Sequence, residues 1–397
     1  MGKRALVIGV DARQLELERT GVARYLINLL RELKGLAPQH RYRLYLSRDG
    51  ARESWLSEPP FEPRRLGPAG PQQQTAWEHW RLPRALRRDR ADVLLAPYYM
   101  APIVCPVPAA VVLHDIAFAT RPDVFRRTPL YWKLRFVAAL SARRAAAVIT
   151  VSDFSRREIE RCYGVGADRL HVIPEAADPG FTPAAGSEAS AEAERIRARY
   201  RLPPRFFLAV GSLTPRRHLT ELLAAFGSIR AAHPDAALMV IGRDLEYPPG
   251  AVDRLVEASA LGEALRRAEW VPESDLVALY RAATASVYLS SYEGFGLPVL
   301  ESMASGTPVI TSDCASLPEV AGGAALLVDP RRPAAIDTAL RTVLEQPAAA
   351  ESLRRRGLER AASFSWRRSA AATLEVLEAI AAERRPKAER PPRAERP

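Results

Sequence analysis

The sequence predicts an α/β fold with two doubly wound domains that face each other across a cleft. Short apolar runs of strand length alternate with helical segments along most of the chain, which is the pattern of parallel sheets. The alternation stops between residues 178 and 204, where Pro, Gly and charged residues dominate, and then restarts. The chain has 397 residues, and a single domain typically has about 100–200.

These observations define a domain plan. We predict a first domain over 1–180, a linker over 181–204, a second domain over 205–363, a helix over 364–382 that crosses back to the first domain, and a disordered basic tail over 383–397.

Composition and charge exclude several classes of function. The net charge is +11, and the tail contributes six basic against three acidic residues. Without an RNP-type motif or a zinc pattern, we expect no nucleic-acid partner. The three cysteines are isolated, so neither a disulfide framework nor a metal site is expected. No apolar stretch of about 18 residues and no cleavable leader is visible, so we expect a cytoplasmic protein.

The first half contains the strand Ala5–Val10, a helix that begins near Gly21, and the strand Arg41–Leu46. A loop-rich segment, 50–74, follows. Later strands are expected at 91–97, 109–113, 147–151 and 170–174. Gly21 at a helix start is equally compatible with a phosphate contact and with a simple turn. His114 directly follows a strand, at the edge where parallel sheets collect ligands, and this favours a functional role.

Residues 121–147 are predicted to be helical and mix arginines with aromatic side chains. Such a helix suits the surface of an anionic membrane. It suits equally an Arg-rich protein surface whose aromatic residues point into the core. We favour the second interpretation, and a peripheral contact with the inner face of a membrane stays open.

In the second half, strands are expected at 206–211, 237–242, 268–271, 285–289, 307–311 and 324–328. After the strand 285–289 comes the stretch Glu293-Gly-Phe-Gly-Leu-Pro-Val-Leu-Glu301, with Pro298 placed to open a helix. Backbone N–H groups of such a glycine turn and of a helix's first turn suit a phosphate. The two carboxylates more plausibly accept hydrogen bonds from hydroxyls, so the pattern predicts a phosphate that carries sugars on both sides.

A second element, Gly211 to His218, lies between the strand 206–211 and the next helix. Its adjacent Arg216 and Arg217 would neutralise a diphosphate and stabilise it as it leaves. Solvated surface arginines are the alternative. The sequence has no Asp-x-Asp pair, so we expect a metal-free site without a cofactor.

These residues resemble the retaining glycosyltransferases of family 4, which have the GT-B fold. The resemblance covers most of the chain, and its specific part is the E-x7-E element from Glu293 to Glu301. Weaker matches occur in the family's order: Thr20–Tyr25, His114-Asp115, Thr150–Ser155, Val172–Pro174, Gly211–His218 and Leu317–Val320.

The resemblance implies a role for each site residue. Glu301 would hold the ribose hydroxyls, and Glu293 would contact hydroxyls of the donor sugar. The turn Gly294-Phe295-Gly296-Leu297 would serve sugar and diphosphate through N–H groups, and Gly211, Arg216 and Arg217 would form the diphosphate site. Gly21 would approach the phosphates from the first domain, and His114 would lie beside the transferred sugar. The expected catalytic residues are Glu293, His114, Arg216 and Arg217.

This chain departs from the family at three points. Arg217 stands where Lys is usual, His218 where Asn is usual, and Glu175–Asp178 replaces an Asn-Gly-Val-Asp-like turn. The first departure keeps the charge and changes the donor geometry.

The predicted reaction is a hexosyl transfer from a nucleoside-diphosphate sugar with retention, without metal. GDP-mannose is the first expectation for the donor and a UDP-sugar the second. A saccharide or a lipid-linked saccharide is the expected acceptor. A sugar-nucleotide epimerase and a non-catalytic nucleotide-sugar-binding scaffold are the alternatives. A dinucleotide dehydrogenase and a P-loop kinase are excluded. No G-x-G-x-x-G motif follows the first strand, and the sequence lacks the Gly-Lys-Ser/Thr motif of a P-loop.

Overall fold

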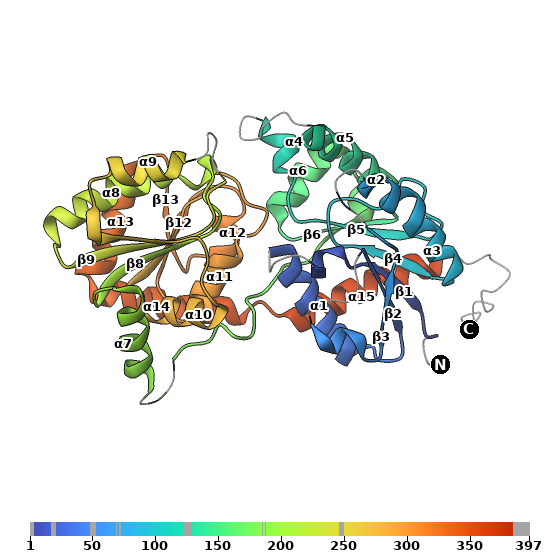
Figure 1. Cartoon of the computed structure of the whole chain (residues 1–397), viewed down its shortest axis with the longest axis horizontal. Helices are drawn as coiled ribbons and strands as arrows, with labels where there is room; N and C mark the ends of the chain where they lie inside the picture. The colour runs from blue at the N-terminus through green and yellow to red at the C-terminus, as the bar shows by residue number, and fades with distance from the viewer. Residues whose placement is uncertain are drawn as a thin grey trace, which may run out of the picture. The chain divides into compact units, whose positions relative to one another are not determined.

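The computed structural model describes residues 4–16, 21–47, 53–68, 70, 73–122, 129–184, 186, 188–245 and 250–383. These residues divide into two compact units (Figure 1). Unit 1 contains the described parts of Met1–Val151, Ser155–Pro174 and Trp366–Pro397, and unit 2 contains those of Ser152–Phe154 and Glu175–Ser365. The chain therefore changes unit at the residue pairs 151/152, 154/155, 174/175 and 365/366.

Unit 1 is built on a seven-stranded parallel sheet in the order β3-β2-β1-β4-β5-β6-β7. Helices α1 and α15 cover one face, and α3, α5 and α6 cover the other (Figure 1). The strands are β1 (Val7–Asp11), β2 (Arg41–Leu46), β3 (Phe61–Arg65), β4 (Val93–Ala96), β5 (Ala109–Leu113), β6 (Ala147–Thr150) and β7 (Leu170–Val172). The helices are α1 (Gly21–Leu36), α2 (Gln74–Ala76), η3 (Trp77–Arg81), α3 (Leu82–Arg88), α4 (Ala117–Thr120), α5 (Pro129–Arg144), α6 (Asp153–Tyr163) and α15 (Trp366–Glu383).

Unit 2 repeats this plan with six parallel strands in the order β10-β9-β8-β11-β12-β13. Helices α8, α9 and α13 lie on one face, and α10, α11 and α14 on the other (Figure 1). The strands are β8 (Arg205–Val210), β9 (Ala236–Ile241), β10 (Leu265–Ala268), β11 (Ala285–Tyr288), β12 (Val309–Ser312) and β13 (Leu326–Val328). The helices are α7 (Glu188–Tyr200), α8 (Leu219–Ala232), α9 (Ala251–Ala258), α10 (Glu273–Ala282), α11 (Leu297–Ala304), α12 (Leu317–Ala321), α13 (Pro333–Glu345) and α14 (Pro347–Ala362).

The sequence pattern explains the layers. Central strands such as β5 and β9 are buried along their whole length, because helices cover both faces of each sheet. Helix α1 buries one stripe of leucines, including Leu26, Leu30 and Leu33, against the sheet. The two doubly wound parallel sheets confirm the predicted fold class.

Two edge strands differ from the prediction. The segment expected to be loop contains β3, which the sequence hides because Pro63 and charged residues interrupt it; an edge strand tolerates both. Strand β10 spans Leu265–Ala268, three residues before the predicted start. Its Arg266 and Arg267 are only half-buried at the edge, whereas the apolar Trp270 beyond it is exposed.

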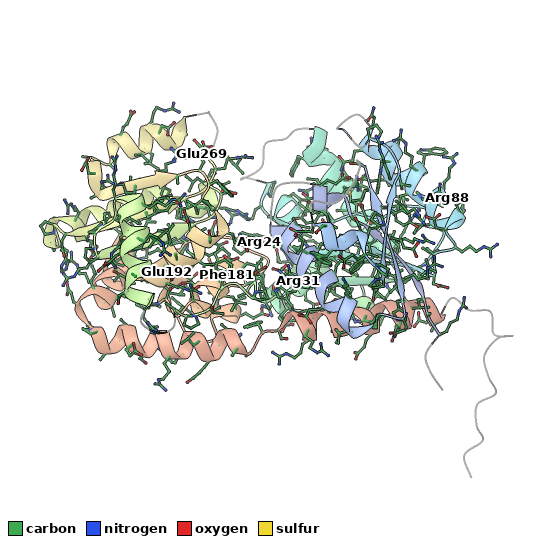
Figure 2. All side chains as sticks on the ribbon, turned by 60° about the horizontal axis from the view of Figure 1, so that its bottom comes forward. Arg24, Arg31, Arg88, Phe181, Glu192 and Glu269 are labelled. Atoms are coloured by element: carbon green, nitrogen blue, oxygen red, sulfur yellow. The ribbon has the colours of Figure 1, made fainter. Side chains whose placement is uncertain are left out.

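The expected linker has structure of its own. Helix α7, which carries Glu192 (Figure 2), packs on α10. There Arg281 forms an ion pair with Glu192 at 3.1 Å. Phe181 packs edge-on against Tyr280 at 5.7 Å between ring centroids. Both contacts lie within unit 2. The predicted tail lies outside the described residues, except for Glu383 at the end of α15.

The preferred interpretation of the basic-aromatic helix is wrong for two of its aromatic residues. Tyr131 of α5 is buried, but Trp132 and Phe136 have 42% and 63% of their surface exposed. Their rings stack with centroids 5.8 Å apart. Phe125, Arg126 and Arg127 lie outside the described residues. In the described parts of the chain, no helix has both the length and the apolar character that a membrane crossing requires.

Candidate functional site

The candidate site in unit 2 lies where its strand order reverses. Strands β8 and β11 are neighbours, and the chain winds outward from them in opposite directions. Loops at the carboxyl ends of such a pair form the ligand crevice of doubly wound sheets. Here they are Gly211–His218, after β8, and Leu289–Gly296, after β11.

The β8 loop is held by backbone contacts to the chain after β9. The N–H of Gly211 donates to the carbonyl of Ile241, and that of Leu213 to the carbonyl of Arg243, both at 2.9 Å. The chains pass so closely that a Cβ on Gly242 would lie 1.9 Å from the Gly211 carbonyl oxygen. Glycine at 242 is therefore required for the loop to keep its position.

Two arginines of this loop surround one carboxylate of the other loop. Arg217 Nη1 lies 3.0 Å from Glu293 Oε1, and Arg216 Nη1 lies 3.9 Å from the same oxygen. The Ser290 hydroxyl donates to that oxygen at 2.7 Å. The Arg217 guanidinium also lies over the Tyr288 ring, 4.4 Å from its centroid. The structure thus brings Arg216, Arg217 and Glu293 into one cluster.

Electrostatics keep Glu293 ionised. Burial raises the pKa of Glu293, but the charges of Arg217 and Arg216 and hydrogen bonds from Ser290 and Tyr288 outweigh it, so the pKa lies below its usual range. Burial holds the pKa of Tyr288 well above its ordinary value. Glu293 is therefore an acceptor of hydrogen bonds at neutral pH.

The remaining predicted donor-site residues lie on the same loop and the helix after it. Gly296 precedes α11 with φ +115°, a conformation that only glycine adopts readily. Leu297 is the first residue of α11, and Glu301 lies one turn later with 3% of its surface exposed. The Phe295 ring packs edge-on against Phe364 at 5.8 Å. The motif therefore spans a fixed turn and a helix start.

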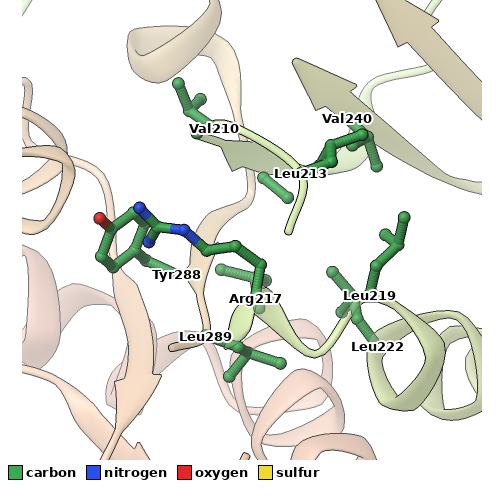
Figure 3. Close-up of a pocket in the computed structure, with 11 residues that line it drawn as sticks. Val210, Leu213, Arg217, Leu219, Leu222, Val240, Tyr288 and Leu289 are labelled. Atoms are coloured by element: carbon green, nitrogen blue, oxygen red, sulfur yellow. The ribbon is translucent and has the colours of Figure 1, made fainter. Parts of the chain in front are cut away.

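Apolar side chains line a small pocket beside Arg217. A pocket of about 30 Å³ is lined by aliphatic side chains, with Arg217 and Tyr288 side by side at its margin (Figure 3). It is far smaller than the 300–1,000 Å³ or so of a ligand pocket. Its lining places the arginine against a low-dielectric surface, which strengthens the interaction of its charge with an anion.

Several polar groups in the β8 loop have no partner among the residues that the structure describes. They are Thr214 Oγ1, Arg217 Nε and His218 Nε2, and each is buried. Buried polar atoms normally form hydrogen bonds, so these three are available to a ligand of this loop. Sequence reasoning overlooked Thr214, Ser290 and Tyr288. The available signal was their position: Thr214 lies in the loop after β8, Tyr288 ends β11, and Ser290 follows it in the next loop.

Unit 1 holds the other two predicted site residues. Gly21 is the exposed first residue of α1, and a Cβ there would meet no atom within 4 Å. His114 directly follows β5, and its Nε2 lies 3.1 Å from the Pro97 carbonyl. The His114 ring also packs edge-on against Tyr25 of α1, with centroids 4.8 Å apart. Within unit 1, His114 is thus adjacent to Tyr25, the fifth residue of α1.

The unit 1 loop after β1 carries a different charge cluster. Arg13 donates to Asp11 at 2.7 Å and to Glu78 at 3.1 Å, and its guanidinium lies over Trp77. Burial lowers the pKa of Arg13, but the two carboxylates outweigh it and raise the pKa above its ordinary value. Here one arginine is enclosed by two carboxylates.

The described part of the chain contains no group of three His, Cys, Asp or Glu side chains that could hold a metal ion. The expectation of a metal-free site stays a prediction.

Comparisons with known proteins agree with this architecture. Residues 19–181 match the family model described as Glycosyltransferase Family 4, and residues 192–360 match the model described as Glycosyl transferases group 1. Over 259 residues the chain is 32% identical to O-antigen chain mannosyltransferase B of Escherichia coli, an alignment that covers 65% of this chain and 67% of the relative.

Two further proteins are similar over longer stretches. The chain is 30% identical to glycogen synthase of Mycobacterium tuberculosis over 302 residues, 74% of this chain and 67% of the relative. The structure of sucrose-phosphate synthase from Thermosynechococcus elongatus matches with a TM-score of 0.75 and 20% identity, over 96% of this chain and all of that one.

Proposed function

Because the chain belongs to the glycosyltransferases of family 4, we propose that it transfers a hexose from a nucleoside-diphosphate sugar to a saccharide or a lipid-linked saccharide. GDP-mannose is the first candidate donor, since the relative from Escherichia coli is a mannosyltransferase. The observation that carries the proposal is the cluster in unit 2, where Arg216 and Arg217 surround the ionised Glu293 beside a glycine turn.

The arginines would act on the leaving group. As the bond between the anomeric carbon and the phosphate oxygen breaks, its electron pair goes to the diphosphate, and two guanidinium groups stabilise that charge. A guanidinium also offers several N–H donors in a rigid fork, so Arg217 suits two phosphate oxygens. The buried Thr214 hydroxyl and His218 Nε2 supply further polar contacts to the same group.

Glu293 would orient the donor sugar. Its carboxylate is ionised, so it accepts hydrogen bonds from sugar hydroxyls and cannot serve as a general acid. We propose retention by attack on the same face: the acceptor hydroxyl oxygen bonds to the anomeric carbon, and its proton moves to the departing phosphate oxygen. Glu301 would hold the ribose, and Gly21 and His114 of unit 1 would contact phosphate and sugar.

Thermal-shift measurements with nucleotides test the donor proposal. A ligand at one hundred times its Kd stabilises the native state by about 2.7 kcal/mol. Stabilisation by GDP and not UDP is the expected result. The reverse would replace GDP-mannose by a UDP-sugar, and no response to either nucleotide would contradict nucleotide-sugar binding altogether.

Product analysis tests the reaction class. With donor and a saccharide acceptor, NMR of the product should show the anomeric configuration of the donor. Conversion of the donor sugar without any acceptor would instead identify an epimerase. Tight binding of the nucleotide sugar, with no transfer to any saccharide in a panel of acceptors, would favour a non-catalytic scaffold protein.

We also propose that unit 1 contacts anionic lipid through α5. Trp132 and Phe136 are exposed and stacked, and the helix contains no acidic residue and ends on Arg143 and Arg144. Exposed aromatic residues beside basic ones suit a lipid interface. The double variant Trp132→Ser with Phe136→Ser should lose co-sedimentation with phosphatidylglycerol vesicles. Trp270→Ser, which changes an exposed tryptophan of unit 2, is the matched control.

A further inference from the structure

The segment Ser152–Phe154 belongs to unit 2, although the residues on both sides of it belong to unit 1. The Glu319 carboxylate accepts the N–H groups of Asp153 at 2.8 Å and Phe154 at 3.1 Å. The Phe154 ring packs edge-on against Tyr292, with centroids 5.3 Å apart. These contacts hold the segment against the loop that contains Glu293, which gives a structural role to two motifs without one so far, Thr150–Ser155 and Leu317–Val320.

The hydroxyl of Ser152 donates to the Gly294 carbonyl at 2.6 Å, and the serine itself is 1% exposed. The Ser316 hydroxyl lies 3.0 Å from the Glu293 carbonyl and 2.8 Å from the Phe295 carbonyl. One residue earlier, the Tyr292 carbonyl accepts from Arg216 at 3.0 Å. Side-chain donors thus lie within hydrogen-bond distance of four successive carbonyls of the loop, and the single Ser316 proton is donated to either Glu293 or Phe295.

Fixed carbonyls determine where the following N–H groups point. In a trans peptide the carbonyl and the next N–H lie in one plane and point in opposite directions. Holding the carbonyls of residues 293, 294 and 295 therefore turns the N–H groups of 294, 295 and 296 away from Ser152 and Ser316. These are the groups that the family resemblance assigns to sugar and diphosphate.

The loop needs this support because two of its residues are glycines. Gly294 and Gly296 have no side chain to restrict rotation of the peptides next to them. Loss of the hydrogen bond from Ser152 removes one restraint on the Gly294–Phe295 peptide, and a rotated peptide would point the Phe295 N–H away from the phosphate.

We propose that Ser152 is a positioning residue for the nucleotide sugar: through the Gly294 carbonyl it orients the Phe295 N–H toward the diphosphate. Ser316 does the same for the peptides on either side. Neither serine touches the ligand, since both hydroxyls are buried on the carbonyl side of the loop. The inference rests on the proposed function, because it needs a nucleoside diphosphate in this site.

The test is calorimetric titration of the full chain with GDP and with UDP. For the nucleotide that the wild type binds, Ser152→Ala should raise Kd five- to tenfold. Ser316→Ala should raise it more, because its hydroxyl faces two carbonyls. Ser152→Cys replaces the hydroxyl by a larger thiol that is a weaker donor, and its Kd should fall between those of wild type and Ser152→Ala.

Thr307→Val is the matched control. Thr307 is also a buried residue of unit 2 whose hydroxyl donates to a backbone carbonyl at 2.6 Å, that of Tyr280. It should lower Tm as Ser152→Ala does and leave Kd unchanged. A Kd within twofold of wild type for both Ser152→Ala and Ser152→Cys would overturn the inference alone. A wild type that bound neither nucleotide would overturn the proposed function as well, so the two failures are distinct.

Discussion

The two units share one winding pattern and differ in the charge balance of equivalent loops. After β1 of unit 1, one arginine lies between the carboxylates of Asp11 and Glu78. After β8 of unit 2, two arginines share the single carboxylate of Glu293. The first cluster satisfies its own cation. The second leaves positive charge for an anion, so the repeated fold supplies the location of a site and the loop residues decide its ligand.

The largest expected effect is a loss of turnover on substitution of Arg217 that substitution of Arg13 does not cause. Arg217→Ala should lower turnover by about 10²–10³-fold, the usual cost of losing a donor to developing negative charge. Arg13→Ala should leave the nucleoside-diphosphate Kd unchanged and destabilise the protein by about 3 kcal/mol, because Asp11 and Glu78 lose their cation. Steady-state kinetics, calorimetric titration with the nucleoside diphosphate and urea unfolding of both variants measure this contrast. Equal losses of turnover in the two variants would remove the distinction.

Glu293→Gln should reverse the usual relation between binding and transfer. The amide keeps the shape but removes the negative charge between two guanidinium groups, so GDP or UDP should bind at least as tightly as to wild type. Transfer should fall by about tenfold or more, since a charge-assisted hydrogen bond to the sugar is lost. Calorimetry gives the nucleotide Kd, and a transfer assay gives the rate of transfer. Near-normal transfer would remove Glu293 from the sugar site.

Two glycines, Gly242 of unit 2 and Gly21 of unit 1, test the difference between the units in a second way. Gly242→Ala would place a methyl group against the Gly211 carbonyl of unit 2, so it should lower Tm by several degrees and weaken nucleotide binding together. Gly21→Ala in unit 1 meets no atom, so its Tm should match wild type. If Gly21 approaches phosphate, only transfer should decline. A lower Tm for Gly21→Ala would show that this glycine serves the fold.

The smallest expected effect is the pH dependence of the stability that Glu293 contributes. Because the native pKa of Glu293 is below the unfolded value of about 4.3, its ionised form stabilises the native state above that pH. The contribution is lost as the pH falls through the native pKa. The difference in unfolding free energy between wild type and Glu293→Gln should therefore be largest near neutral pH and shrink below about pH 4. Unfolding curves from pH 3 to 7 measure it, and a difference that grew in acid would contradict the pKa direction.

Much of the fold was predictable because apolar alternation sets the order of strands and helices. Strand β2 and helix α10 begin where the sequence predicts them. Prediction failed at sheet edges, where β3 contains Pro63 and β10 contains two arginines, because an edge strand needs no continuous apolar run. It also failed at Trp132 and Phe136, since sequence does not reveal which face of a helix lacks a covering layer.

The site was predictable as a set of residue types and not as a set of contacts. Arginines after one strand and a glutamate after another were expected to serve the same nucleoside-diphosphate sugar. Their pairing with each other, and with Tyr288 and Ser290, depends on side-chain directions that no spacing encodes. The contact between Ser152 and Gly294 joins residues 142 positions apart and follows only from the packed structure.

Helix α15, the last helix in the part of the chain that the structure describes, has a consequence for synthesis. Trp366 of α15 packs against Tyr25, and Glu378 lies 3.3 Å from the buried His40, both within unit 1. A ribosome therefore releases every residue of unit 2 before it releases the helix that completes unit 1. Unit 1 therefore cannot complete its fold until α15 has been synthesised. Until then, α1 and the face of the sheet that α15 covers lack this helix.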